Sequence, residues 1–187
     1  MKLRKRKIAL LSILLIVPIT VFVGILDENS SKTLFIITRN FDDNILKYDL
    51  RLNDSGVLVE DNPIHPYWIR NTEGGVIKEL NGMQRKFAYG LNYDRLDSDF
   101  YRFNFVSYDK LDLYLKKSGS DVYRVLMNLD GNFVIVEEIF LQVEKNGTIF
   151  NLPKLNWVDI KWYSPAQRKR GVKRIDPNEQ VKDNFAL

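Results

Sequence analysis

Apolar and polar residues alternate along most of the chain after residue 33, which is typical of β-strands with one buried face. The clearest case is 46–53, where every second residue from Leu46 is apolar and the residues between are polar or charged. The other predicted strands are 101–105, 111–115, 123–129, 133–145 and 158–162, together with the continuous apolar run 33–38. Turn pairs such as Asp130-Gly131 and Asn146-Gly147 separate them. We therefore expect a mainly β domain of about eight antiparallel strands, folded as a β-barrel or a β-sandwich.

One segment departs from this two-residue period. Between residues 80 and 91 the apolar residues recur every three or four positions, as on one face of a helix. Asn81 is a suitable N-cap, Gln84 stands at the capping-box position, and Gly90 suits a helix end. The sequence predicts one short helix at about residues 81–89.

The N-terminus has the charge and length pattern of a membrane anchor. Residues 1–7 carry five positive charges, and residues 8–26 are uncharged, close to the roughly 20 residues that a membrane-spanning helix needs. A cleaved signal peptide has a shorter apolar region and a small-x-small site, which this segment lacks. We expect an uncleaved transmembrane signal-anchor helix at 8–26, with residues 1–7 in the cytoplasm and the rest extracytoplasmic.

This anchor sets the expected domain organisation. Residues 27–32 form a polar spacer, 33–164 the extracytoplasmic β-rich domain, and 165–187 a basic polar tail. The net charge of +4 comes from the N-terminus, because without its five basic residues 23 Lys and Arg face 24 Asp and Glu. We therefore expect no nucleic-acid partner. The chain has no cysteine, so core burial rather than disulfides must stabilise the domain.

Several short motifs resemble a known family. They are Tyr67-Trp68-Ile69, Glu79-Leu80 and the run from Gln84 to Gly90, QRKFAYG. In these the chain resembles the bacterial proteins grouped as domain of unknown function 4833, and the similarity extends from Phe35 to Arg174-Ile175. The resemblance implies an exported or envelope-associated β-rich protein, and it implies no activity and no catalytic residues.

The chain offers little for catalysis. His65 is the only histidine, no cysteine is present, and no serine stands in a nucleophile-elbow context. Zinc would lack its usual ligands, and the cluster of Asp94, Asp97 and Asp99, which could hold calcium, fits a solvated acidic loop better. We expect no catalytic residue, no metal site and no cofactor, and we leave the question of an enzyme open while favouring a non-enzyme.

Glu137 interrupts the apolar stretch 133–145. A β-bulge at Glu137-Glu138 would turn both carboxylates outward, and the alternative is a carboxylate that faces a cavity or pairs with a cation such as Arg85. The chain is also rich in aromatic residues, most of which should be core. The ligand-binding candidates are Trp68, Arg85, Tyr89 and Glu137.

Three functions fit these observations. The leading hypothesis is a membrane-anchored, non-enzymatic binding module for an apolar or amphiphilic, lipid-like ligand. The second is a structural protein that docks another cell-envelope protein through a sheet edge or the basic tail. The third is an envelope hydrolase that uses two carboxylates.

Overall fold

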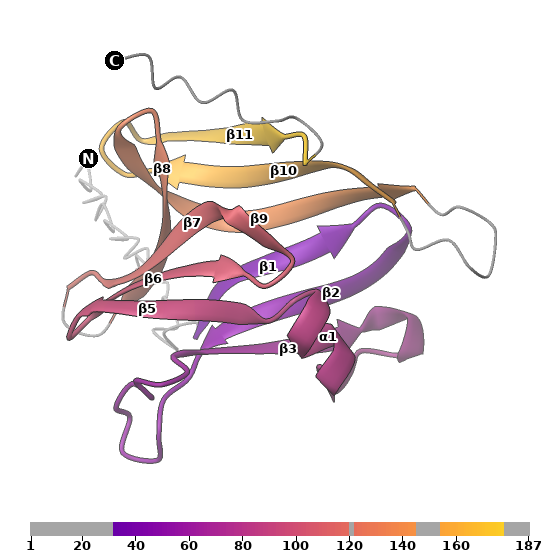
Figure 1. The fold of residues 1–187 in the computed structure, drawn as a ribbon, viewed down its shortest axis with the longest axis horizontal. Coiled ribbons are helices and arrows are strands. Elements are labelled where there is room, and N and C mark those ends of the chain that lie inside the picture. The colour runs from indigo at the N-terminus through magenta and orange to yellow at the C-terminus, as the bar shows by residue number, and fades with distance from the viewer. Residues whose placement is uncertain (1–31, 120–121, 145–153, 178–187) are drawn as a thin grey trace, which may run out of the picture.

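The strands of the computed structural model join into one sheet (Figure 1), described over residues 32–119, 122–144 and 154–177. In chain order the elements are β1 (Thr33–Arg39), β2 (Asp42–Leu50), β3 (Ile64–Arg70), the 3-10 turn η1 (Asn71–Glu73), β4 (Val76–Glu79), α1 (Gly82–Phe87), β5 (Leu91–Asp97), β6 (Phe100–Phe105), β7 (Tyr108–Lys117), β8 (Tyr123–Leu129), β9 (Asn132–Glu144), β10 (Lys154–Ser164) and β11 (Lys169–Ile175).

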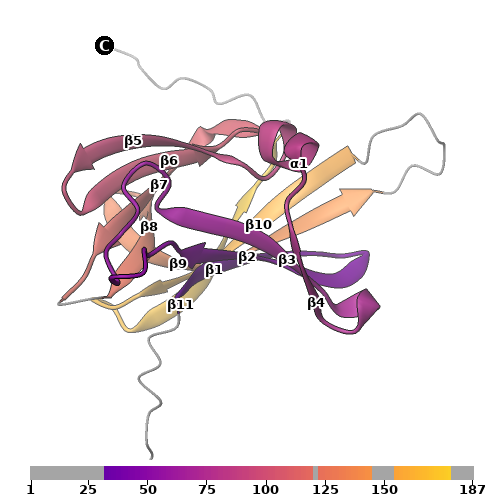
Figure 2. The ribbon, with the colours of Figure 1, turned by 90° about the horizontal axis from the view of Figure 1, so that it is seen from below.

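The sheet branches at its longest strand, β9. Residues 132–135 of β9 pair with β8, residues 138–141 pair with β1, and β10 pairs with residues 135–144. One path of neighbouring strands therefore runs β4-β3-β2-β1-β9-β8-β7-β6-β5, and β10 and β11 extend from β9. The two arms of this path curl so that β5–β7 face β1–β3 (Figure 2). The result is a curled half-barrel with the apolar core between its arms.

The mainly β fold with one short helix is confirmed, and three finer expectations are corrected. The sheet is a half-barrel whose path has two ends, β4 and β5, so it is neither a closed barrel nor two stacked sheets. It is not wholly antiparallel, because β1 and β9 are parallel. The described residues contain eleven strands rather than eight. The additional ones include β4, with all four residues exposed, and β11, so neither shows a buried alternating face.

The alternation in β2 is confirmed by the burial of its side chains. Leu46 and Tyr48 are fully buried and face the core, where Tyr48 stacks on Phe35 of β1 with ring centroids 4.4 Å apart. Phe105 of the opposite arm meets both rings edge-on. The core thus joins the two arms through aromatic packing, which favours this curled arrangement over a flat sheet.

The helix is confirmed at Gly82–Phe87, slightly shorter than expected. The Asn81 side chain accepts a hydrogen bond from the Gln84 backbone N–H at 2.9 Å, and Gln84 Oε1 accepts one from the Asn81 N–H at 3.1 Å, which completes the capping box. Only Leu80 of the expected apolar face is buried, while Met83 and Phe87 are largely exposed. The helix therefore lies over the end of the sheet rather than in the core.

The β-bulge at Glu137-Glu138 is also confirmed. Lys161 of β10 pairs with Glu138 and Trp162 with Val136, so Glu137 is the extra residue of β9. The bulge changes which side chains face inward. A regular strand with Glu137 on its apolar face would have turned Phe133 and Ile135 inward. Instead Val134 and Val136 are buried before the bulge and Ile139 after it, so the expected inward face is wrong before Glu137.

Residues 169–175, which the sequence pattern placed in the basic tail, form β11 and pair along β10. Their outward side chains are charged, so the strand depends on backbone pairing and on the contact of Gly171 with the Trp162 ring rather than on an apolar stripe. The expected anchor at 8–26 lies outside the described residues. Among those that are described, no helix is both long and apolar enough to cross a membrane.

Candidate functional site

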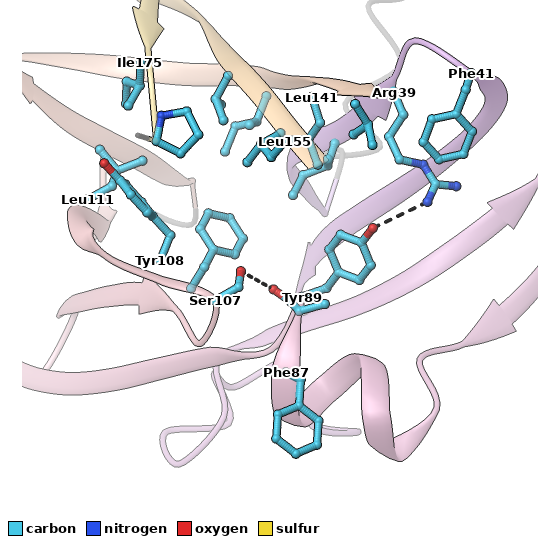
Figure 3. A pocket seen from close by; sticks show the side chains of 17 residues that line it. Arg39, Phe41, Phe87, Tyr89, Ser107, Tyr108, Leu111, Leu141, Leu155 and Ile175 are labelled. Carbon is cyan, nitrogen blue, oxygen red and sulfur yellow. Dashed lines mark hydrogen bonds between the residues drawn. The ribbon is translucent and has the colours of Figure 1, made fainter. Parts of the chain in front are cut away.

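An apolar pocket of about 440 Å³ opens where the two arms meet β9, β10 and β11 (Figure 3). This volume lies within the roughly 300–1,000 Å³ of small-molecule sites. Its lining combines aliphatic and aromatic side chains with few polar groups. The lining residues are Ile37, Arg39, Phe41, Phe87, Ala88, Tyr89, Phe105, Ser107, Tyr108, Leu111, Ile139, Leu141, Val143, Leu155, Val158, Ile175 and Pro177.

The aliphatic wall of this pocket depends on the bulge in β9. Ile139, Leu141 and Val143 follow the bulge at alternate positions and all line the pocket, together with Leu155 and Val158 of β10. Because successive strand residues point to opposite faces, a β9 that alternated regularly through Glu137 and Glu138, with no bulge, would turn the outer face of this segment inward. The bulge therefore directs two carboxylates outward and an aliphatic stripe into the pocket.

Arg39, the one charged residue among the described residues that line the pocket, lies at one end of it. Its Nη2 donates to Asp42 Oδ2 at 2.7 Å, and its guanidinium lies 4.5 Å from the ring centroids of both Phe41 and Trp68. The Arg39 Nε is buried without a hydrogen-bond partner. The ion pair balances the charge of Arg39, and the two aromatic contacts hold its guanidinium beside the apolar wall.

Tyr89 lies next to Arg39 and is fixed on three sides. Its hydroxyl accepts a hydrogen bond from Arg39 Nη1 at 3.4 Å, and its ring meets the Trp68 ring edge-on with centroids 5.4 Å apart. Its backbone carbonyl accepts from the Tyr48 hydroxyl at 2.9 Å. Burial, with smaller effects of Tyr89 and Tyr93, raises the pKa of Tyr48 well above its usual value, so this donor keeps its proton.

The structure brings together two of the four expected ligand-binding residues. Tyr89 lines the pocket, and Trp68 packs behind it. Arg85 instead pairs with Glu79 at 2.6 Å, and Glu137 with Arg170 at 3.1 Å, so the expected alternative of a Glu137–Arg85 pair is wrong. Neither Arg85 nor Glu137 is a pocket-lining residue, and a role of any of the four in binding stays a prediction.

Sequence reasoning missed Arg39 and the aliphatic wall. Arg39 ends an apolar strand, a position that is usually solvated, and only the folded chain places Phe41 and Trp68 against it. The aliphatic residues of β9 and β10 recur along the sequence in the same way as residues of strands that face a filled core, so the sequence does not mark them as pocket residues. The one available signal was Glu137, because its interruption of the apolar stretch marked the bulge.

None of the lining residues that the structure describes is Asp or Glu, so these residues supply no carboxylate for acid or base chemistry. His65, in β3 rather than in a loop, has its Nε2 2.8 Å from a carboxylate oxygen of Glu79. Burial would raise the pKa of Glu79, but the hydrogen bond with His65 and the charge of Arg85 outweigh it and lower that pKa. Within the described part of the chain, no three His, Asp or Glu side chains are grouped to hold a metal ion.

Glu138 of β9 links the neighbouring strands β1 and β10 through side-chain hydrogen bonds. It accepts hydrogen bonds from Thr38 Oγ1 of β1 at 2.7 Å and from Lys161 Nζ of β10 at 2.8 Å. Burial acts to raise the pKa of Glu138, but these two hydrogen bonds outweigh it, so the pKa is lowered. A lowered pKa means that the ionised carboxylate stabilises the folded state.

We expect Glu138→Gln to lower the free energy of unfolding by about 0.5–1 kcal/mol at neutral pH, because the glutamine loses the ionic attraction to Lys161. This contribution is present above the unfolded-state pKa of about 4.3 and is lost as the pH falls through the lower folded-state value. The difference from the wild-type protein should therefore shrink below about pH 4.3 and disappear once the pH lies below the folded-state value. Urea unfolding at a series of pH values measures it.

Glu144→Gln is the matched control, because Glu144 ends the same strand and is exposed. It should unfold as the wild type does at every pH. A Glu138→Gln deficit that persists in acid would show that the change acts through packing rather than through ionisation.

The family comparison agrees with this architecture. The model of a domain of unknown function, DUF4833, matches residues 35–174, which include both arms, the pocket wall and the bulge. The chain belongs to this family. No curated protein and no solved structure matches the chain.

Proposed function

We propose that this protein is a non-enzymatic binding module that holds an apolar or amphiphilic, lipid-like ligand in the pocket between its arms, and that residues 8–26 anchor it in a membrane with the β domain outside. The observation that carries the binding proposal is the pocket itself. It is about 440 Å³ in volume and lined almost wholly by aliphatic and aromatic side chains.

The chemistry of the lining supports a ligand that is mostly hydrocarbon. Burying an apolar chain there is favourable at roughly 25 cal/mol per Å² of surface removed from water. Ser107 is one of the few polar lining residues, and its hydroxyl proton is already used in a hydrogen bond to the Ala88 carbonyl at 2.6 Å. The part of the lining that the structure describes holds no carboxylate that could act on a bound molecule. The pocket is therefore suited to holding a ligand rather than to reacting with it.

Filling the pocket should abolish binding. We expect Leu141→Trp to reduce labelling of the pocket by a photoactivatable alkyl diazirine about fivefold or more, because the indole occupies the space of the ligand. The full-length protein is labelled in detergent, and mass spectrometry of its peptides measures the label on 132–144 and 154–164 relative to the label on 8–26.

The matched control is Phe133→Trp, a change to the same residue on the same strand at a site that is half exposed and outside the pocket. It should leave labelling unchanged. Equal labelling of the pocket peptides in both variants, or none in the wild-type protein, would contradict the binding proposal.

The edge of the sheet supports the second candidate function, a docking protein. β4 pairs only with β3, and its Val76 and Ile77 are exposed by 47% and 66%. An exposed apolar edge strand can pair with a strand of another protein. Two results together would favour this function over ligand binding. The alkyl probe would label only residues 8–26, and a protein that co-purifies stoichiometrically with the wild type would no longer co-purify with the Ile77→Lys variant.

A further inference from the structure

The pocket has a defined polar end, and its chemistry distinguishes between classes of amphiphile. Arg39 and Tyr89 lie at this end, whereas Tyr108 and Leu111 lie at the opposite end, as Figure 3 shows. An amphiphile places its headgroup where hydrogen bonds are offered and its chain along the apolar wall. The headgroup therefore belongs beside Arg39 and Tyr89.

Beside the buried Arg39 Nε, which has no acceptor among the described residues, the second donor at this end is the Tyr89 hydroxyl. It accepts from Arg39 Nη1, and none of the described residues accepts its own proton. Its ring is fixed by Trp68 and its backbone by Tyr48, so the hydroxyl is oriented before any ligand binds. A preorganised donor that already accepts from a guanidinium is a strong partner for a ligand oxygen.

The charge at this end is already balanced. Asp42 pairs with Arg39 at 2.7 Å, and Asp42 Oδ1 also accepts from the Asn44 backbone N–H, so the carboxylate is fixed in place. Among the described residues, no other charged residue lines the pocket. An anionic headgroup would therefore lie close to a second carboxylate with only one cation between them, which is unfavourable where water is excluded.

We infer that the pocket selects single-chain lipids whose polar end is an uncharged carbonyl, such as an acyl ester or acyl amide, over the corresponding free carboxylate. The ester carbonyl accepts the Tyr89 proton and adds no charge to the Arg39–Asp42 pair. This inference rests on the proposed ligand-binding function and specifies the substrate class of the same pocket.

Competition against the alkyl diazirine tests the inference in the full-length protein. The competitors are methyl dodecanoate and dodecanoate, which share a chain and differ in the head, at about pH 9, where the acid is ionised. The ester should suppress pocket labelling at roughly one tenth of the concentration that the carboxylate needs. Labelling of residues 8–26 corrects for partition of each competitor into the detergent.

Three variants separate the contributions of the two groups. Tyr89→Phe should weaken competition by the ester about three- to tenfold, and it should change direct labelling by the alkyl probe by a smaller factor, because the probe has no acceptor. Tyr114→Phe removes the hydroxyl of a β7 tyrosine outside the pocket and should change neither. Asp42→Asn leaves Arg39 with an unbalanced charge, so it should shift the preference toward dodecanoate.

The outcomes distinguish this inference from the proposed function. Equal competition by ester and carboxylate, or no effect of Tyr89→Phe, would overturn the headgroup assignment while the labelled pocket still supports a binding module. A preference for dodecanoate in the wild-type protein would overturn it as well. If the alkyl probe does not label the pocket, both proposals fail together.

Discussion

Replacing Gly90 with alanine is expected to destabilise the protein by about 2–4 kcal/mol, one of the two largest effects of a single substitution that the structure indicates. A Cβ at this position would lie 1.9 Å from the Arg85 carbonyl oxygen and 2.9 Å from its carbon, both of them backbone atoms that cannot turn aside. The last turn of α1 would have to move away from β5. Thermal or urea unfolding followed by circular dichroism measures the loss.

The same movement would also affect the pocket. Tyr89 immediately precedes Gly90, and the Gly90 carbonyl accepts a hydrogen bond from the Val106 N–H at 3.0 Å. Gly82→Ala is the matched control, because a Cβ there meets nothing within 4 Å and the residue begins the helix. That variant should be as stable as the wild type or slightly more so. Equal stability of the two variants would show that the helix end accommodates the added carbon without strain.

Trp68→Ala should cost about 3–5 kcal/mol of folding free energy, the usual range when a large aromatic side chain is removed from a core. Trp68 is 1% exposed and lies in the centre of β3, and it contacts both the Arg39 guanidinium and the Tyr89 ring. Its removal leaves a cavity and also releases the two residues at the polar end of the pocket. Denaturant unfolding measures the first effect, and ester competition measures the second.

Phe133→Ala provides the comparison for this change, because Phe133 is an aromatic residue of the sheet that is 51% exposed. Its removal should cost less than about 1 kcal/mol. If Trp68→Ala costs no more than Phe133→Ala, the packing of Trp68 between the arms is not what stabilises β3. If Trp68→Ala destabilises the fold but the surviving folded protein still prefers the ester, Trp68 does not position Tyr89.

The sequence by itself determined the features that depend on neighbouring residues. Alternation fixed the inward faces of β2 and β6, since a strand side chain is buried or exposed according to the parity of its position. Asn81 and Gln84 predicted the start of α1, because a capping box acts within four residues. Glu137 revealed the bulge, since a carboxylate on an apolar face must be turned outward or paired.

Only the tertiary structure decided which strands are neighbours and where a pocket remains. The parallel pairing of β1 with β9 joins residues about a hundred positions apart, and alternation marks a buried face without naming its partner. Arg39 and Trp68 come from β1 and β3 and meet only after both strands have paired with β2. The aliphatic wall has the same pattern as ordinary core, because whether an inward side chain meets a neighbour or an open pocket depends on the distance between the two arms.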